Sequence, residues 1–262
     1  MHLSVMFKLT SQIAMVVLIG LMTACQNERP ADSLTMLTAP DYCPYEFRAK
    51  QDNGKFELVG FDIDVAKAIA DKLDLSLTIE TRHFNQIMPA LDQLQADFAM
   101  AAITPTSNRR QMVDFSAIYY TQSIAIVSRQ IQPITSLESL IQRTVGVKAT
   151  SFQSQELTRY ADISQIEFGT TDELIAAVKA QQVDAGILDQ AIAPKYVTPA
   201  SQLLWTPVES VADVAGVAIA FPKSSSPDVQ RAINTALARL QQDGTMTKLI
   251  HEWFDIYQCP QD

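Results

Sequence analysis

Apolar and polar positions alternate along the chain in short runs that predict strands separated by amphipathic helices. In the stretch 60–73 apolar residues recur on one helical face, and Asp62 is predicted to be the N-cap of that helix. A second helix is predicted over 84–95. Strands and helices that alternate at this spacing are typical of parallel βαβ units. The strands of this first series are predicted at 34–38, 75–80 and 97–103.

The alternation stops and then starts again further along the chain. The extended segments 115–122 and 123–129 follow each other with no full helix between them, and a second series of strands and helices occupies 144–197. A further extended segment follows at 214–221. This pattern favours an α/β fold of two Rossmann-like lobes joined by two hinge strands, with a ligand cleft between the lobes. We expect lobe 1 to comprise 34–121 plus 217–262 and lobe 2 to comprise 122–216.

The helices predicted near the C-terminus have clear boundary signals. Ser226 is predicted to be an N-cap, with Pro227 at the first helical position and Gly244 as the stop signal. A last helix is predicted over 245–254.

The first 24 residues are predicted to be a signal peptide. Lys8 precedes an unbroken apolar run at 13–22, which is shorter than the about 20 residues that a membrane-spanning helix needs. The run ends in "MTAC", which resembles the lipobox of bacterial lipoproteins, with methionine where leucine is usual. We therefore expect a lipoprotein-type signal peptide over 1–24, lipidation of Cys25, a linker over 25–33 and a periplasmic protein anchored to the membrane by its lipid. The alternative is an ordinary secreted protein in which Cys25 is incidental.

Composition excludes several classes of function. The formal net charge is −9, and an acidic chain lacks the basic face that nucleic-acid binding requires. The sequence has no metal-ligand spacing, phosphate-binding glycine loop or nucleophile elbow, so we expect no metal, no cofactor and no catalytic residue. With Cys25 assigned to the lipid, Cys43 and Cys259 remain as a possible disulfide pair in an exported protein. The sequence alone leaves their pairing open.

Several stretches of the chain resemble a known family. They include "GFDIDVAKAIA", "VDFSAIYY" and "RAINTALARLQQDGTMTKLIHEWF". Together they are similar to the periplasmic amino-acid-binding proteins of ABC importers (solute-binding protein family 3), among them the lysine/arginine/ornithine-, histidine- and glutamine-binding proteins. The similarity extends from about Leu34 to Phe254. It implies the type II periplasmic binding protein fold and a monomer that captures a free amino acid between its lobes and delivers it to an ABC transporter permease.

The resemblance also implies ligand-binding roles for individual residues. Arg109 matches the arginine that holds the α-carboxylate of the ligand, and a planar guanidinium suits this role because it can donate to both carboxylate oxygens. Asp189 matches the second-lobe carboxylate that holds the α-ammonium group. The family usually has a glycine just before its second-lobe donors and this chain has none, so the identity of that donor stays open. The other matched positions are the backbone carbonyl of Ala102, Thr104, and the pair Thr150 and Ser151.

Two aromatic residues match the positions that recognise the ligand side chain. Tyr42 corresponds to the ring that packs on this side chain, and Phe84 to a second ring found in cation-binding members. Rings on both sides of a slot suit a planar or cationic group. Arginine- and lysine-binding members have an acidic residue where this chain has Ala39, and Asp41 or Glu46 is the substitute that we consider. We expect arginine or another basic amino acid as the ligand.

Alternatives remain for the residues and for the function. The hydroxyl groups can bond within their own turns, Asp189 can cap the helix that follows, and the two aromatic rings can pack in the core. A secreted cyclohexadienyl dehydratase shares this architecture, but it would need a general acid in the cleft, and no extra aligned carboxylate is evident. A ligand-sensing module is the third class. We expect a binding protein and not an enzyme.

Overall fold

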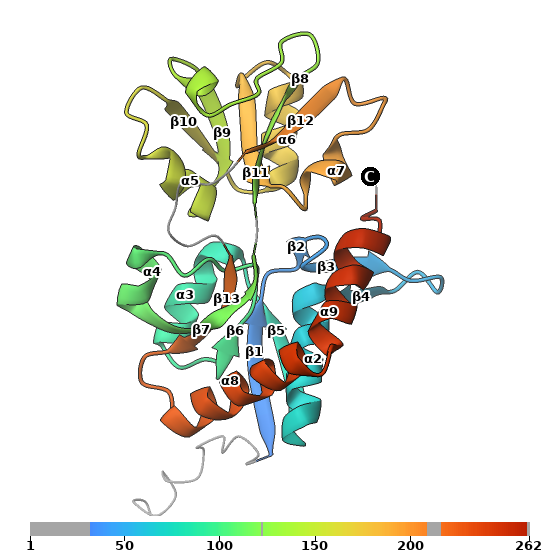
Figure 1. Ribbon diagram of the computed structural model, residues 1–262, viewed down its shortest axis with the longest axis vertical. Coiled ribbons are helices and arrows are strands. Elements are labelled where there is room, and N and C mark those ends of the chain that lie inside the picture. The colour runs from blue at the N-terminus through green and yellow to red at the C-terminus, as the bar shows by residue number, and fades with distance from the viewer. Residues whose placement is uncertain (1–31, 122, 209–215, 261–262) are drawn as a thin grey trace, which may run out of the picture. The chain divides into compact units, whose positions relative to one another are not determined.

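The computed structural model of the protein describes residues 32–121, 123–208 and 216–260 (Figure 1). The predicted signal peptide and Cys25 lie outside the described residues. From Leu34 onward the chain forms one compact unit. Its described strands make two five-stranded sheets and one three-stranded sheet.

The first five-stranded sheet combines strands from the beginning and the end of the chain. In sheet order they are β5 (Ser76–Thr81), β1 (Ser33–Thr38), β6 (Phe98–Ala99), β13 (Val217–Pro222) and β7 (Val113–Tyr120). Strand β1 pairs with β6 in parallel, as a βαβ unit requires. Strand β13 is antiparallel to both β6 and β7, so the sheet is mixed.

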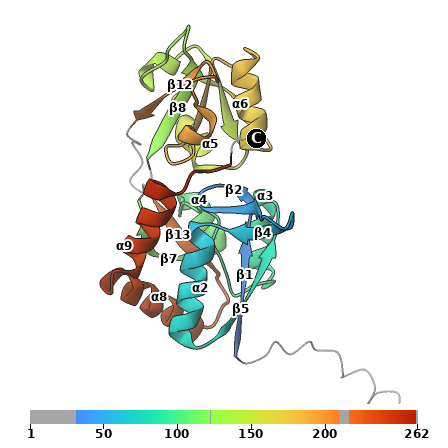
Figure 2. The same cartoon turned by 90° about the vertical axis from the view of Figure 1, so that its right-hand side faces the viewer.

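Helices cover both faces of the first sheet. Successive side chains of a strand point to opposite faces, so Met36 and Ile219 pack on one face, and Leu37 and Ala220 pack on the other. The first face meets three helices that lie beside one another in Figures 1 and 2, and the second face meets one. The three helices are α2 (Phe61–Leu73), α8 (Pro227–Gln242) and α9 (Thr245–Ile250), and the single helix is α3 (Phe84–Asp92).

The second five-stranded sheet is built from the middle of the chain. In sheet order its strands are β10 (Ser164–Phe168), β9 (Thr144–Lys148), β11 (Ala185–Asp189), β8 (Ile124–Arg129) and β12 (Leu203–Val208). Strand β9 is parallel to β10 and β11, whereas β8 is antiparallel to β11 and β12. One core cluster joins the sheet to α5 (Phe152–Leu157) and η1 (Glu138–Leu140), and another joins it to α6 (Thr171–Lys179) and α7 (Ala193–Tyr196).

A small antiparallel sheet and strand β12 were not predicted from the sequence. The small sheet consists of β2 (Asp41–Tyr42), β3 (Glu46–Lys50) and β4 (Phe56–Val59). These strands are short, and β4 has no fully buried residue, so a hydrophobic alternation is missing. The remaining described helices are α4 (Ser107–Met112) and the π-helix η2 (His251–Ile256).

The chain passes between the two large sheets twice. The first connection leads from Tyr120 at the end of β7 to Ile124 at the start of β8. The second leads from Val208 at the end of β12 to Val217 at the start of β13, and its residues 209–215 lie outside the described part. These are the two places where hinge strands were expected.

The predicted N-cap role of Asp62 is wrong. Helix α2 begins at Phe61, and its N-cap is Gly60, whose φ of 134° favours glycine. Asp62 is instead fully buried inside the first turn, where Oδ1 accepts a hydrogen bond of 2.7 Å from the Tyr119 hydroxyl. Its Oδ2 accepts another of 2.8 Å from the backbone N–H of Ala102. This carboxyl group therefore makes tertiary contacts that the local sequence does not reveal.

At the C-terminus the predicted boundary signals are confirmed, and Gly244 has a second role as well. Ser226 caps α8, since its Oγ accepts from the backbone N–H of Asp228 at 3.3 Å, and Pro227 is the first helical residue. The helix ends at Gln242, and Gly244, with φ of 83°, serves as the N-cap of α9. A left-handed glycine thus separates two consecutive helices.

The strand predicted over 97–103 is much shorter in the structure. Only Phe98–Ala99 is assigned to β6, although the N–H of Met100 still donates to the carbonyl of Leu37 at 3.1 Å. Ala102 has a left-handed φ of 48°, which an extended strand cannot accommodate. The regular strand ends before this point, although the carbonyl of Ile103 still accepts from the N–H of Ala218 in β13 at 2.9 Å, and the loop that leads to Arg109 follows.

Candidate ligand-binding site

Residues from the small sheet, from the second five-stranded sheet, from helices α3, α4 and α5 and from the loop after β6 line one cavity. Its volume is about 30 Å³. Arg109 and Asp189, predicted to hold the two ends of an amino acid, both line it. The lining residues are Tyr42, Glu46, Phe84, Ala101, Ala102, Thr104, Arg109, Lys148, Ser151, Phe152, Gln153 and Asp189.

Helix α4 directs Arg109 into this cavity. Thr106 caps the helix by accepting from the backbone N–H of Arg109 at 3.4 Å, and the side chain of Arg109 is buried. Nη1 donates to the carbonyl of Thr104 at 2.8 Å, and Nη2 donates to the carbonyl of Thr150 at 2.9 Å. Burial lowers the pKa of Arg109 to about 10, so it remains charged at neutral pH. Two of its five N–H donors are used in these bonds, and a carboxylate needs only two more.

Asp189 ends strand β11 on the opposite side of the cavity. It is 1% exposed, and Oδ2 lies 3.4 Å from the hydroxyl of Tyr45, which donates to it. Oδ1 is buried and has no hydrogen-bond partner among the described residues. Burial raises the pKa of Asp189 to about 7, although hydrogen bonds from Ala191 and Tyr45 act in the other direction. A buried carboxyl oxygen without a hydrogen-bond partner favours the approach of a cation.

Glu46 is a second buried acid with an unsatisfied oxygen. It is the first residue of β3 and is 1% exposed, and its Oε2 has no hydrogen-bond partner in the described part of the chain. Burial and the neighbouring charge of Asp62 raise the pKa of Glu46, while the charge of Lys148 opposes the rise. Burial also raises the pKa of Asp62 to about 6. The cavity wall therefore holds two acidic groups, Glu46 and Asp189, and two cations, Arg109 and Lys148, with Asp62 buried close to Glu46.

The two predicted aromatic residues both line the cavity. Tyr42 stacks on Tyr45 with ring centroids 5.8 Å apart, and its pKa is raised by burial and by the charge of Asp189, so its hydroxyl is neutral. Phe84 is the first residue of α3, and its ring centroid lies 5.2 Å from Cζ of Arg109. The alternative considered from the sequence was that both rings pack in the core. Instead, both rings line the cavity.

The predicted loop donors differ in position. Thr104 and Ala102 line the cavity. Ser151 also lines it, but its Oγ caps α5 by accepting from the N–H of Ser154 at 3.1 Å, as the local alternative predicted. Thr150 is not among the lining residues, and its carbonyl accepts from Arg109. Its φ of 56° is left-handed, which agrees with the glycine that the related family usually has near this point.

Sequence reasoning missed four residues of the cavity, which are Ala101, Lys148, Phe152 and Gln153. Lys148 is the last residue of β9, a strand with parallel neighbours, and Phe152 and Gln153 follow in the first turn of α5. Ligand sites of open α/β sheets form beyond the carboxyl ends of strands. That rule, applied to β9 as it was to Arg109, would have found Lys148.

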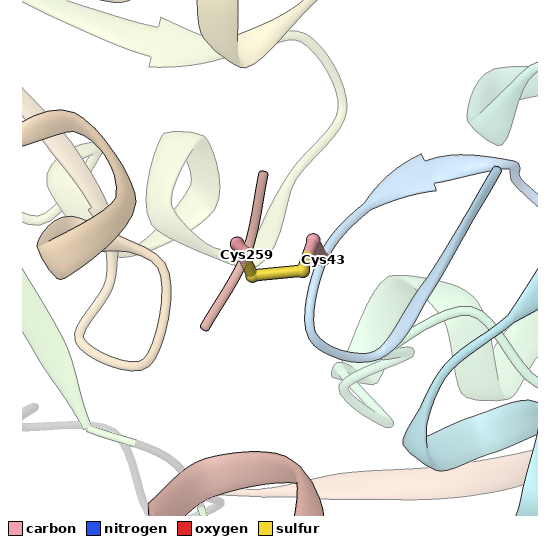
Figure 3. The surroundings of a disulfide bond; sticks show 2 residues. All are labelled: Cys43 and Cys259. Carbon is pink, nitrogen blue, oxygen red and sulfur yellow. A yellow bond between two sulfur atoms is a disulfide. The ribbon is translucent and has the colours of Figure 1, made fainter. Parts of the chain in front are cut away.

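A disulfide joins Cys43 to Cys259 (Figure 3). Their Cα atoms are 5.9 Å apart, although 216 positions separate them in the sequence. Cys43 follows Tyr42 directly, so the bond ties the C-terminal segment to the loop that carries one wall of the cavity.

No other type of site competes with this cavity in the described ranges. Within residues 32–121, 123–208 and 216–260, no group of three or more histidine, cysteine, aspartate or glutamate side chains is arranged to hold a metal ion. In the same ranges, every helix is too short or too polar to cross a lipid bilayer.

The sequence profile of the bacterial extracellular solute-binding proteins, family 3, matches residues 34–256. The chain belongs to this family. It is 33% identical over 242 residues to the arginine-binding extracellular protein ArtP of Bacillus subtilis (strain 168), covering 89% of this chain and 92% of ArtP. Its fold is accordingly the two-lobed α/β fold of these binding proteins, as predicted.

Solved structures agree with the family assignment. An ancestral arginine-binding protein bound to arginine superposes with a TM-score of 0.77 at 33% identity, covering 86% of this chain and 100% of the other. The ancestral amino-acid-binding protein AncCDT-1, a precursor of cyclohexadienyl dehydratase, has a TM-score of 0.73 at 28% identity, covering 85% and 95%. Both are described as binding proteins, so the relatives favour binding over catalysis.

Proposed function

We propose that this family member captures a basic amino acid, with arginine as the first candidate. One observation carries the proposal. Two buried carboxylate oxygens, Oδ1 of Asp189 and Oε2 of Glu46, have no hydrogen-bond partner among the described residues, and both side chains line the cavity that Arg109 enters. Leaving buried acceptors unpaired is costly, so a ligand that supplies two cationic groups gains affinity from both.

The charges of a basic amino acid match these groups one by one. Its α-carboxylate pairs with Arg109, its α-ammonium group with Asp189, and its cationic side chain with Glu46. Tyr42 and Phe84 add aromatic faces on which a guanidinium can pack. The donors for the carboxylate include the loop at Thr104 and the second-lobe turn at 150–151. A neutral side chain would bring no positive charge to Glu46, so we place basic ligands first.

The same groups explain why binding closes the lobes. We assign 34–121 and 217–262 to lobe 1, which contributes Arg109, and 122–216 to lobe 2, which contributes Asp189. A ligand held by both lobes favours the closed state by its differential affinity for it. The relatives named above support arginine as the ligand, and family membership supports delivery of the closed, loaded monomer to an ABC transporter permease. We place the protein in the periplasm, anchored through lipidated Cys25.

A dehydratase activity is the second candidate, because AncCDT-1 is described as a precursor of such an enzyme. Asp189, a buried acid of the cavity whose pKa is raised to about 7, is capable of proton transfer. Prephenate carries two carboxylates, however, and Glu46 and Asp189 would repel one of them. We therefore propose a binding protein without catalytic activity. Incubation with prephenate should yield no phenylpyruvate.

Thermal-shift and calorimetric titrations of the signal-free chain test the proposal. We expect arginine, lysine or ornithine to raise the melting temperature more than glutamine or citrulline, because a ligand at 100 times its Kd adds about 2.7 kcal/mol of stability. Arg109→Ala should weaken binding by about 2–5 kcal/mol. Arg110→Ala is the matched control, since Arg110 is exposed and is not among the lining residues. Equal affinities of the two variants, or no stabilisation by any amino acid, would contradict the proposal.

A further inference from the structure

Lys148 places a cation of the protein itself in the slot between the two aromatic rings. It is the last residue of β9, and its side chain is 14% exposed. Nζ lies 4.9 Å from the ring centroid of Tyr42 and 5.5 Å from that of Phe84. Both distances are within the about 6 Å at which an aromatic face attracts a cation. The ammonium group of Lys148 therefore contacts the two rings on which the side chain of a basic ligand would pack.

Acidic groups complete the same binding position. Nζ of Lys148 lies 3.5 Å from Oδ2 of Asp41, at the edge of the cavity. The second acidic group is Glu46. Burial raises the pKa of Glu46, and the positive charge of Lys148 acts in the opposite direction. A buried carboxylate needs a counter-ion, and in the structure Lys148 is the cation that shares the cavity with Glu46 on the side of Tyr42 and Phe84.

Charge repulsion requires this ammonium group to move when a basic ligand binds. A guanidinium between Tyr42 and Phe84 would meet Nζ of Lys148 at a distance where like charges repel strongly. Asp41 is 43% exposed, so rotation of the lysine stem toward it moves the charge into contact with solvent.

We propose that Lys148 is a specificity-determining residue that competes with the ligand. A cationic side chain has to displace its ammonium group from between Tyr42 and Phe84, whereas a neutral amide side chain is bound with the group in place. The inference rests on the proposed function, because it concerns the side-chain end of that same site. Lys148 weakens the binding of arginine and lysine, and it donates to the carbonyl oxygen of glutamine or citrulline. The ligand preference is then set by the opposing charges of Glu46 and Lys148.

Calorimetry on Lys148→Met with arginine and glutamine tests this inference. Methionine keeps an apolar stem of similar length and removes the charge. We expect arginine to bind the variant at least about tenfold more tightly than the wild-type protein, and glutamine to bind it no more tightly. Lys195→Met is the matched control, because Nζ of Lys195 lies 5.1 Å from the ring of Tyr196 but neither residue lines the cavity. Neither affinity should change in the control.

The possible results separate this inference from the proposed function. An arginine affinity that is unchanged or lower in Lys148→Met, with amino-acid binding intact, overturns the role of Lys148 alone. Absence of amino-acid binding by both proteins overturns the proposed function and the competition together. Lys148→Gln repeats the test if the methionine variant melts at a lower temperature. In a crystal structure with arginine, Nζ should lie outside the slot, and its presence between the two rings would also overturn the inference.

Discussion

Replacing Glu46 with glutamine removes one charge from the proposed site and keeps the size of the side chain. Glu46 is 1% exposed, and its Oε2 has no hydrogen-bond partner among the described residues, so solvent screens it weakly. Two unit charges 4 Å apart interact with about 4 kcal/mol at an effective dielectric constant of about 20. Truncating one partner of a buried charged pair typically costs about 2–5 kcal/mol.

The expected change in affinity follows from these magnitudes. Burial raises the pKa of Glu46, so part of the attraction to the ligand is spent on ionising this carboxyl group. The loss should therefore lie toward the lower limit, at about 2–3 kcal/mol, which weakens arginine binding by about 30- to 150-fold. Citrulline has the shape of arginine without the charge, and its affinity should change by about fivefold or less.

Isothermal titration calorimetry of the wild-type protein, Glu46→Gln and Asp41→Asn with both ligands measures these changes. Asp41 is the matched control, because it is the other acid considered for this role and is 43% exposed. Its substitution should alter arginine affinity by about fivefold or less. Circular dichroism and thermal melting establish that each variant is folded. The reasoning is refuted if Glu46→Gln binds arginine as tightly as the wild-type protein, or if Asp41→Asn shows the larger loss.

Three further predictions concern protons and the disulfide. Because burial raises the pKa of ligand-free Asp189 to about 7, arginine binding at pH 7 should release about half a proton per ligand from this group, and affinity should fall from pH 8 to pH 6. Calorimetry in buffers of different ionisation enthalpy will detect this release, and buffer-independent heats would contradict it. The same raised pKa means that, between about pH 4 and pH 7, the folded state keeps a proton that the unfolded state has released. The stability of the ligand-free protein should therefore fall as pH rises through this window. Thermal melts at pH 5 and pH 8 measure this, and a higher melting temperature at pH 8 would contradict it. The disulfide between Cys43 and Cys259 closes a loop of 216 positions, and replacing both cysteines with serine should lower the free energy of unfolding by about 4–5 kcal/mol. Equal denaturant midpoints of the wild-type protein with and without reductant would contradict this stabilisation by the disulfide.

Local signals in the sequence predicted much of what the structure shows. Ser226 and Pro227 begin α8 as predicted, because a cap and a fixed φ act on the residues next to them. Arg109 was predicted to enter the cleft from its position after a strand and from the family pattern, and it lines the cavity. Asp62 carries the same local signal as a cap, but its carboxyl group is taken by Tyr119 and Ala102 from distant parts of the chain.

The side-chain end of the candidate site depended on tertiary structure in the same way. Asp41 and Glu46 lie five positions apart in one loop-rich stretch, and the sequence offered no reason to choose between them. Pairing of β3 with β2 and β4 buries Glu46, while Asp41 remains at the rim. Lys148 reaches Tyr42 and Phe84 only because β9 of the second sheet ends opposite them.

By itself, the sequence determined the alternation of strands and helices, the two α/β series and the family, and it predicted the residues that match the ends of an amino acid. These features depend on local periodicity, caps and short motifs, in which the interacting residues are close together in the chain. Tertiary structure alone decided which carboxylates lose their water, which oxygens remain unpaired and which cation lies between the aromatic rings. Burial and charge pairing depend on residues that are far apart in sequence, so they exist only once the two lobes face one cavity.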